Sequence, residues 1–258
     1  MVKTRLHAFL LAFISIVLAA TIVLGWQTPS YPVEFNPPDR GAPENLIGAG
    51  TRFSDGPGTT RGPLEPRQAI VEIDGTILEC PFSALVPQSG LGNYGLTLNA
   101  YPTFFIHFPQ IPRTTLEFVL SDDDSGEIVY QTSYVLAERD ATFGITLPRD
   151  SNVPPLEVGK IYTWQVSIRS NQLPTPSGYI VRGEIERFEP TPKFAQALVE
   201  ASPEEKVALY AEASLWYDAV KTLADLRRTD PDNDRLRADW IELMQAVGLD
   251  DIAAKPLL

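Results

Sequence analysis

The feature that most constrains the fold is an alternation of apolar and polar residues, which recurs in short segments over residues 69–188. In the segment TLEFVLSD, Leu116, Phe118 and Leu120 fall on one face, and the residues between them fall on the other. A period of two is that of an extended strand, whose successive side chains point to opposite faces of a sheet. Later segments place further apolar residues on one face: Phe143, Ile145 and Leu147, and then Tyr179, Val181 and Ile185.

Clusters of Pro, Asn, Asp and Gly separate these segments and mark turns between strands. About seven short strands of this kind are what an immunoglobulin-like or fibronectin-III-like sandwich needs. We therefore predict an all-β domain, a mostly antiparallel β-sandwich of this class, over residues 67–189.

The segment PPLEVGKIYTWQVSI, residues 154–168, favours the same fold class. It has a Leu, a Gly three residues later and a Tyr three residues after that, which matches the approach to a tyrosine corner. In this motif the Tyr hydroxyl bonds to the backbone a few residues upstream. We predict such a bond between Tyr162 and a backbone group near Leu156. The strand that follows would point these residues inward: Tyr162, Trp164, Val166 and Ile168.

The apolar period changes to that of helices in residues 190–258, which we call the helical cap. The segment TPKFAQALVEA offers Thr191 as the N-cap of a first helix. The segment SPEEKVALYAEAS has Ser202 and Glu205 at the spacing of a capping box. Two further segments, LWYDAVKTLADLRR and DRLRADWIELMQAVG, each have an apolar seam along one face.

The segment ALYAEASLWYDAVKTLADLRRTDPDND resembles a tetratricopeptide repeat. Ser214 takes the small position before the turn. The next helix has the aromatic, small and large positions in order: Trp216, Ala219 and Leu223. We therefore predict a tetratricopeptide-like helical hairpin within the cap. Because such repeats are usually stable only in stacks of three or more, this one either packs on the sandwich or binds a partner, and both alternatives stay open.

The first 26 residues have the layout of an export signal. Lys3 and Arg5 precede an apolar run over residues 8–26, which is either a signal peptide cleaved after Gly25 or a retained signal anchor. Residues 27–66 are dense in Pro and Gly, and we predict a mobile linker there. We expect a periplasmic or extracellular protein that touches the inner membrane only through the N-terminal run, if that run is retained.

Composition excludes several classes of function. The formal net charge of −12 opposes binding to nucleic acid, which needs clustered Lys and Arg. Cys80 is the only cysteine, so neither an intrachain disulfide nor a cysteine-based zinc site is possible. His107 is the only histidine after the export segment, and we expect it on the outer face of a strand. No phosphate-binding loop or nucleophile elbow is present, so we predict no cofactor and no enzymatic activity.

Two acidic segments could in principle bind calcium. In SDDDSGEIVY, Asp122 and its acidic neighbours surround Gly126, and a hairpin turn is favoured over a calcium site. In DPDNDRLRAD the spacing begins like that of an EF-hand, but Arg235 stands where that loop requires Gly. We predict instead a turn between helices, with Asn233 or Asp234 as the N-cap.

Several segments, from about Arg40 to the end of the chain, together resemble a known family. In order they are RGAP, GAGTR, SALVP, YGLTLNAYPTFFIHFP, LEFVLSDDDSGEIVY, PPLEVGKIYTWQVSI, ALYAEASLWYDAVKTLADLR, DWIELMQAVGL and IAAKPL. They are similar to an uncharacterised cyanobacterial family filed as a domain of unknown function (DUF928). The resemblance implies an exported envelope protein of a photosynthetic bacterium, and it carries over no catalytic residue. Relatives tend to have a cysteine soon after the Gly-Thr-Arg-Gly stretch, whereas here the first is Cys80, so a thiol role does not transfer.

These observations together predict a non-enzymatic protein–protein interaction module of the cell envelope, whose partners are other envelope proteins. The expected contact residues are exposed positions of the helical cap: Tyr210, Tyr217 and Arg227. The alternative is a carbohydrate- or peptidoglycan-binding module, with or without weak hydrolase activity. That alternative requires a cluster of exposed aromatic rings or a pair of carboxylates in a cleft.

Overall fold

The computed structural model describes nine stretches of the chain: residues 33–35, 69–73, 76–80, 83–89, 92–110, 114–136, 139–150, 152–169 and 179–258. All of them lie in one compact unit that begins at Val33. The strands are β1 (Ala69–Ile73), β2 (Thr76–Cys80), β3 (Ser83–Ala84), β4 (Gln88–Ser89), β5 (Gly92–Thr97), β6 (Thr103–Phe108), β7 (Thr114–Asp122), β8 (Ile128–Leu136), β9 (Ala141–Thr146), β10 (Ile161–Arg169) and β11 (Tyr179–Arg187). The helices are α3 (Pro192–Glu200), α4 (Pro203–Glu212), α5 (Trp216–Thr229), α6 (Asp234–Ala246) and α7 (Asp250–Ala253).

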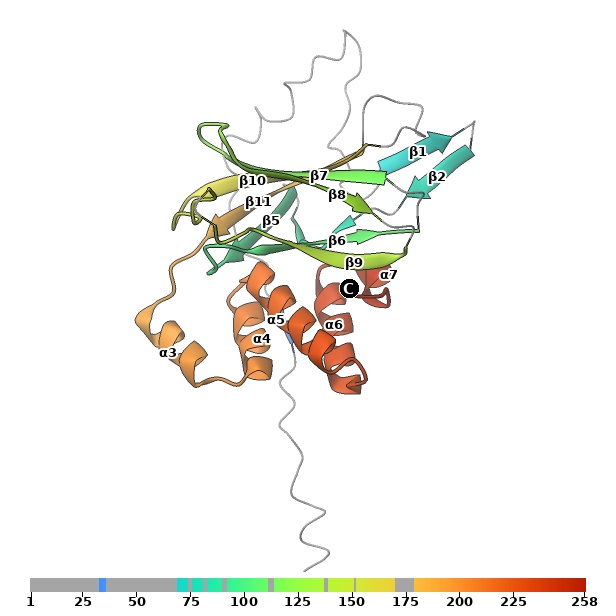
Figure 1. Cartoon of the computed structure of the whole chain (residues 1–258). Coiled ribbons are helices and arrows are strands. Elements are labelled where there is room, and N and C mark those ends of the chain that lie inside the picture. The colour runs from blue at the N-terminus through green and yellow to red at the C-terminus, as the bar shows by residue number, and fades with distance from the viewer. Residues whose placement is uncertain are drawn as a thin grey trace, which may run out of the picture. The chain divides into compact units, whose positions relative to one another are not determined.

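The strands form a sandwich of two sheets and a separate hairpin (Figure 1). The larger sheet has six strands in the order β4-β5-β11-β10-β7-β8, and the smaller has three in the order β3-β6-β9. The hairpin consists of β1 and β2. Among the described ladders only β5 with β11 is parallel, so the larger sheet is mixed. The predicted architecture, a β-sandwich followed by helices, is confirmed at this level.

The period-two alternation correctly identified the residues between the sheets. Leu116, Phe118 and Leu120 of β7 are fully buried. The ring of Phe118 lies 4.9 Å from that of Phe104 on β6, so the two sheets pack face to face. Next to β7, Trp164 on β10 opposes Gly183 on β11. A Cβ atom at that glycine would lie 2.3 Å from the Trp164 ring. Only glycine, which has no side chain, therefore fits at this position of the strand.

The central strand of the smaller sheet, β6, is buried on both faces, because the helices cover the side that points away from the larger sheet (Figure 1). All six residues of β6 are buried, although only alternate ones face the other sheet. On the helical side, the guanidinium of Arg228 lies 5.5 Å above the Phe105 ring. His107 occupies the outer face of β6, as expected, but the helical cap leaves it only 1% exposed.

The predicted hydrogen bond of the Tyr162 hydroxyl is present. The backbone N–H of Glu157 donates to the Tyr162 hydroxyl at 3.0 Å, one residue after the expected partner. Leu156 itself is fully buried, and its carbonyl accepts from Arg187 at 2.7 Å. The bond between Glu157 and Tyr162 fixes the connection that enters β10. Tyr162 and Trp164 are buried, so the aromatic residues of this segment belong to the core.

The helix boundaries follow the predicted caps. The side chain of Thr191 caps α3, and Ser202 and Glu205 form both bonds of the capping box at α4. Asn233 caps α6 by accepting from two backbone N–H groups, which confirms the turn predicted between the helices. The turn between α4 and α5 contains Ser214 with a φ of 62°, a left-handed conformation for a residue that is not glycine.

The linker prediction is wrong at one described site. Val33 and Phe35, within the Pro- and Gly-rich segment, are 2% and 6% exposed. The Phe35 ring meets Trp216 of α5 edge-on, with 4.9 Å between the ring centroids. Apolar burial therefore fixes this point of the segment to the helical cap. The rest of residues 27–66 and the export segment, residues 1–26, lie outside the described residues, and none of the described helices is long and apolar enough to cross a membrane.

Candidate interaction surfaces

The beginning of α5 joins the helical cap to both sheets. The indole N–H of Trp216 donates to the backbone carbonyl of Leu85, directly after β3, at 2.8 Å. The indole N–H of Trp164 in the larger sheet donates to the Tyr217 hydroxyl, also at 2.8 Å. A Cβ atom at Gly95 of β5 would lie 2.8 Å from the Tyr217 ring, so the ring packs directly on the strand backbone. Of the two open alternatives for the cap, packing on the sandwich is therefore confirmed.

Asp218, the next residue of α5, places a carboxyl group with a raised pKa at this contact. Its carboxylate accepts from the backbone N–H of Leu98 at 2.8 Å. Burial between the helix and the end of β5 raises the pKa of Asp218 to about 6, although hydrogen bonds from Leu98 and Thr97 oppose the shift. Burial, and after it the neighbouring Asp218, raises the pKa of the Tyr210 hydroxyl. We therefore expect the stability of the contact between cap and sandwich to depend on pH.

The expectation that the three candidate contact residues are exposed is wrong. Tyr217 is 4% exposed, because it lies between the sheet and α5. Tyr210 is half-buried on α4. Arg227 is half-buried as well, and its guanidinium lies 5.0 Å above the ring of Trp240 on α6. These side chains hold the cap together, and Tyr217 is not accessible to a partner.

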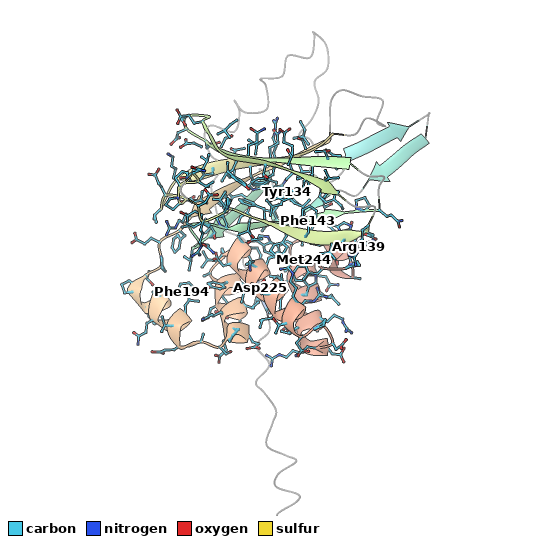
Figure 2. All side chains as sticks on the ribbon, in the orientation of Figure 1. Tyr134, Arg139, Phe143, Phe194, Asp225 and Met244 are labelled. Carbon is cyan, nitrogen blue, oxygen red and sulfur yellow. The ribbon has the colours of Figure 1, made fainter. Side chains whose placement is uncertain are left out.

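A surface that the sequence prediction missed is formed by α3. No residue of this helix is buried. Its three larger apolar side chains lie within one broad arc at helical spacing, and we call them the α3 surface: Phe194, Leu198 and Val199. Phe194 and Leu198 are half-buried, whereas Val199 is 83% exposed. None of the three belongs to the apolar core, and Figure 2 shows the Phe194 side chain on this helix.

The opposite side of α3 is polar, since Gln196 and Glu200 are exposed and hydrogen-bond at 2.9 Å. An amphipathic helix in a folded protein normally buries its apolar face. The signal for the surface was present in the sequence, in the spacing of FAQALV. It could not be separated from that of a packed helix, because the sequence does not show which neighbour covers a face.

The only described histidine lies in a partly buried polar cluster. His107 Nδ1 is 3.3 Å from the Thr142 hydroxyl, and His107 Nε2 is 3.3 Å from a carboxylate oxygen of Asp140. Lys255 pairs with the second oxygen of Asp140 at 2.8 Å. Burial lowers the pKa of His107, and Asp140 partly opposes that shift.

A hydroxyl, an imidazole and a carboxylate in this order are the parts of a nucleophilic triad. Thr142 and His107 are, however, each 1% exposed, and they oppose each other as neighbours on β9 and β6. A substrate would have no access to the hydroxyl. The cluster instead connects Lys255, beyond α7, to the smaller sheet.

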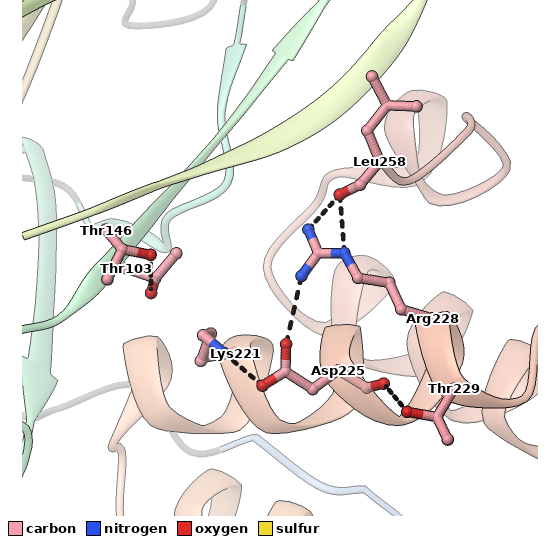
Figure 3. A network of polar contacts seen from close by, with 7 residues as sticks. All are labelled: Thr103, Thr146, Lys221, Asp225, Arg228, Thr229 and Leu258. Atoms are coloured by element: carbon pink, nitrogen blue, oxygen red, sulfur yellow. Dashed lines mark hydrogen bonds and ion pairs between the residues drawn. The ribbon is translucent and has the colours of Figure 1, made fainter.

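The residues after α7 continue this connection along the edge of the smaller sheet. The N–H of Thr142 donates to the carbonyl of Pro256 at 2.7 Å, and the N–H of Leu258 donates to the carbonyl of Thr142 at 2.8 Å. Arg228 of α5 contacts both the Leu258 carbonyl and the Asp225 carboxylate (Figure 3). Residues 256–258 therefore pair with the edge of β9 at Thr142 and hold the last part of the chain on the sandwich.

The acidic turn after β7 is a hairpin turn, as predicted. One carboxylate oxygen of Asp122 accepts from the N–H groups of Asp124 and Ser125, at 3.0 and 2.9 Å. The other pairs with Lys160, whose ammonium is the main cause that lowers the pKa of Asp122 to about 2. Gly126 has a φ of 72°, which few other residues adopt. Within the described parts of the chain, no group of three or more His, Cys, Asp or Glu residues is placed to hold a metal ion.

Comparisons with known proteins add little about activity. A family model described as Domain of Unknown Function (DUF928) matches residues 57–257. No curated protein matches the chain. Two crystal structures of Parabacteroides merdae β-glucuronidase, one of them with glycerol in its active site, match at 10% and 11% identity with TM-scores of 0.21. In each case the match covers 42% of this chain and only 13% of the enzyme, and a likeness this weak supports no conclusion about fold or activity.

Proposed function

Since the chain belongs to this family of unknown function, we propose its role from the geometry: it is a non-enzymatic protein–protein interaction module that binds its partner through the α3 surface. The observation that carries the proposal is an amphipathic helix with no buried residue. A single exposed apolar residue is ordinary, whereas an apolar helix face on which no residue is fully buried indicates a binding site. The partner chemistry that fits is an apolar helix or strand of another protein.

The neighbouring structure supports this assignment. Short connections hold α3 between β11 and the capping box of α4, which itself leads into the anchored start of α5. A partner would therefore meet a helix whose two ends are fixed, which lowers the entropy lost on binding. Complete burial of an exposed Val or Leu contributes roughly 1.5–3 kcal/mol, so the α3 surface can supply several kcal/mol of binding free energy.

We also propose a finer description of the fold. The tyrosine corner at Tyr162 and the antiparallel ladders of β7, β8 and β10 support an immunoglobulin-like or fibronectin-III-like sandwich. The pair α4 and α5, joined at Ser214, supports a single tetratricopeptide-like hairpin. Such a hairpin lacks neighbouring repeats, and its packing on the sandwich provides the missing support.

The expected location is part of the proposal. The basic start and apolar run of residues 1–26 support export, so the partners would be other proteins of the cell envelope. The net charge of −12 disfavours an anionic lipid surface as the binding partner.

The test compares two matched double variants in the native host. Leu198→Gln with Val199→Gln makes two of the three residues of the α3 surface polar while retaining a good helix former at each position. Gln196→Ala with Glu200→Gln changes the polar side of the same helix and is the control. We expect wild type and control to co-purify the same envelope protein, with at least tenfold less recovered by the apolar-face variant. Equal recovery with all three proteins would refute the assignment.

The alternative, a carbohydrate- or peptidoglycan-binding module, stays a prediction. The exposed aromatic residues in the described part of the chain are Tyr134 on β8 and Phe188 after β11. β8 and β11 are not neighbours in the sheet, and the two residues do not form the aromatic cluster that such a site requires. No observation on these residues favours that function over protein binding.

A further inference from the structure

The edges of the sandwich differ in how they are protected. An unpaired strand edge presents free N–H and C=O groups to any other strand, so proteins usually shorten, charge or cover it. Two of the four edges, β3 and β4, consist of only two residues each. The edge of β9 is paired with residues 256–258 at Thr142. The fourth edge, β8, pairs on one side with β7 and has no described partner on the other.

The strand β8 also lacks protective residues. Its sequence, IVYQTSYVL, contains no charged residue, no Pro and no Gly over nine positions. Ile128 and Val135 are each 60% exposed, and Tyr134 is 37% exposed and visible on the larger sheet (Figure 2). β-Branched and aromatic residues, which favour strand pairing, make up most of the strand. A long, uncharged and exposed edge of this kind is suited to the addition of another strand.

The sequence of β8 is nearly palindromic about Thr132, and this symmetry indicates which strand is added. Reversed, IVYQTSYVL becomes LVYSTQYVI. In an antiparallel pair of two such strands centred on Thr132, each residue would face one of the same kind. The opposed pairs are Thr132 with Thr132, Gln131 with Ser133, Tyr130 with Tyr134, Val129 with Val135, and Ile128 with Leu136.

We propose that β8 is a homodimerisation site, at which the β8 strands of two copies of this chain pair antiparallel about a two-fold axis at Thr132. Such an interface is isologous, so every match along the strand occurs twice except that of Thr132 with itself on the axis. Aromatic and β-branched residues opposite their own kind are among the stabilising cross-strand pairs. The joined sheet would continue through both copies, from β4 of one to β4 of the other.

The distribution of charge on the chain supports a second copy as the partner of β8. Each copy carries a formal net charge of −12, so self-association needs a contact free of acidic residues. The strand β8 satisfies this condition along its full length. The central residues 130–134 are in regular register with β7, and the register shift opposite Leu120 and Ser121 lies beyond them, toward Ile128. Residues 130–134, which pair regularly with β7, therefore form the centre of the predicted pairing between the two copies of β8.

The size of the contact predicts a weak dimer. Nine residues of strand are about 30 Å long, and a single edge of this length buries less area than a typical stable interface. We therefore expect dissociation constants in the micromolar range, raised further by the charge repulsion at low ionic strength.

The first experiment uses full-length copies with two different tags, co-expressed with the export segment intact and purified in mild detergent. Gln131→Lys with Ser133→Lys places Lys opposite Lys twice across the predicted pair. Gln131→Lys with Ser133→Glu has the same number of changes but places Lys opposite Glu twice. We expect the Lys–Lys variant to reduce co-purification of the second tag at least tenfold, and the Lys–Glu variant to retain it. Equal co-purification by the two variants would overturn the proposal.

A second experiment tests the register without charge changes. In a Cys80→Ser background, Thr132→Cys would bring two cysteines together on the two-fold axis. Opposed Cα atoms in antiparallel strands are about 4.5–5.5 Å apart, which suits a disulfide. The control Gln131→Cys would oppose Ser133 and not itself. We expect a covalent dimer of the Thr132→Cys chain on oxidation and little from the control. Failure of Thr132→Cys to cross-link, or equal cross-linking by the control, would contradict the predicted pairing.

Discussion

Replacement of Asp218 by Asn removes the carboxyl whose ionisation is most strongly opposed by the fold. Burial raises the pKa of this group from 3.8 to about 6. The carboxyl is protonated in both states below pH 3.8, and it is ionised in both states above pH 6. Between these values the folded protein holds a proton that the unfolded chain has released, so raising the pH costs stability. A difference of about 2 pKa units corresponds to about 3 kcal/mol of unfolding free energy.

The amide introduced by Asp218→Asn would remain neutral at every pH, and its side-chain oxygen could still accept from the N–H of Leu98. We therefore expect Asp218→Asn to have little effect at about pH 4 and to stabilise the protein by up to about 3 kcal/mol at about pH 7. Urea unfolding of wild type and variant at both pH values measures this. Both proteins contain the same other titrating groups, so the contributions of these groups cancel when the unfolding free energies of wild type and variant are subtracted at each pH. If wild type and variant lose stability equally between these two pH values, the reasoning about Asp218 is wrong.

Other substitutions test the contacts that fix the fold. Tyr217→Phe would leave the Trp164 indole N–H buried without its acceptor, and we expect a loss of about 1–3 kcal/mol in urea unfolding; no loss would mean that the bond at 2.8 Å does not stabilise the cap. Tyr162→Phe would remove the acceptor of the Glu157 N–H and should lower the unfolding free energy by about 1 kcal/mol, whereas an unchanged midpoint would contradict the role of the tyrosine corner. Gly183→Ala would place a Cβ atom against the Trp164 ring and should lower the melting temperature by several degrees or more; an unchanged melting temperature would contradict the packing.

Local features of the fold were predictable from the sequence because short-range physics determines them. The alternation in TLEFVLSD identified Leu116, Phe118 and Leu120 as core residues, and all three are fully buried. The capping box of Ser202 and Glu205 fixed the start of α4. Each of these signals depends on residues within a few positions of one another, so no knowledge of the tertiary structure was required.

Long-range contacts were not predictable in the same way. Phe35 is surrounded by Pro-rich sequence, and nothing local indicates that it packs against Trp216. Tyr217 lies beside the apolar seam of α5, and its burial depends on Trp164, which is 53 residues earlier in the chain. The exposed edge of β8 follows from the strand order, which the alternation of residues does not determine. The sequence therefore indicated the local elements, but it did not show which side chains the long-range contacts would bury.

The most direct test of the proposed function is the affinity of the partner recovered from the native host, measured with purified full-length proteins. Isothermal titration would compare wild type with the variant Leu198→Gln, Val199→Gln and with the polar-face control. We predict a dissociation constant at least tenfold higher for the apolar-face variant and an unchanged value for the control. Equal affinity of all three proteins would contradict the claim that the α3 surface is the binding site.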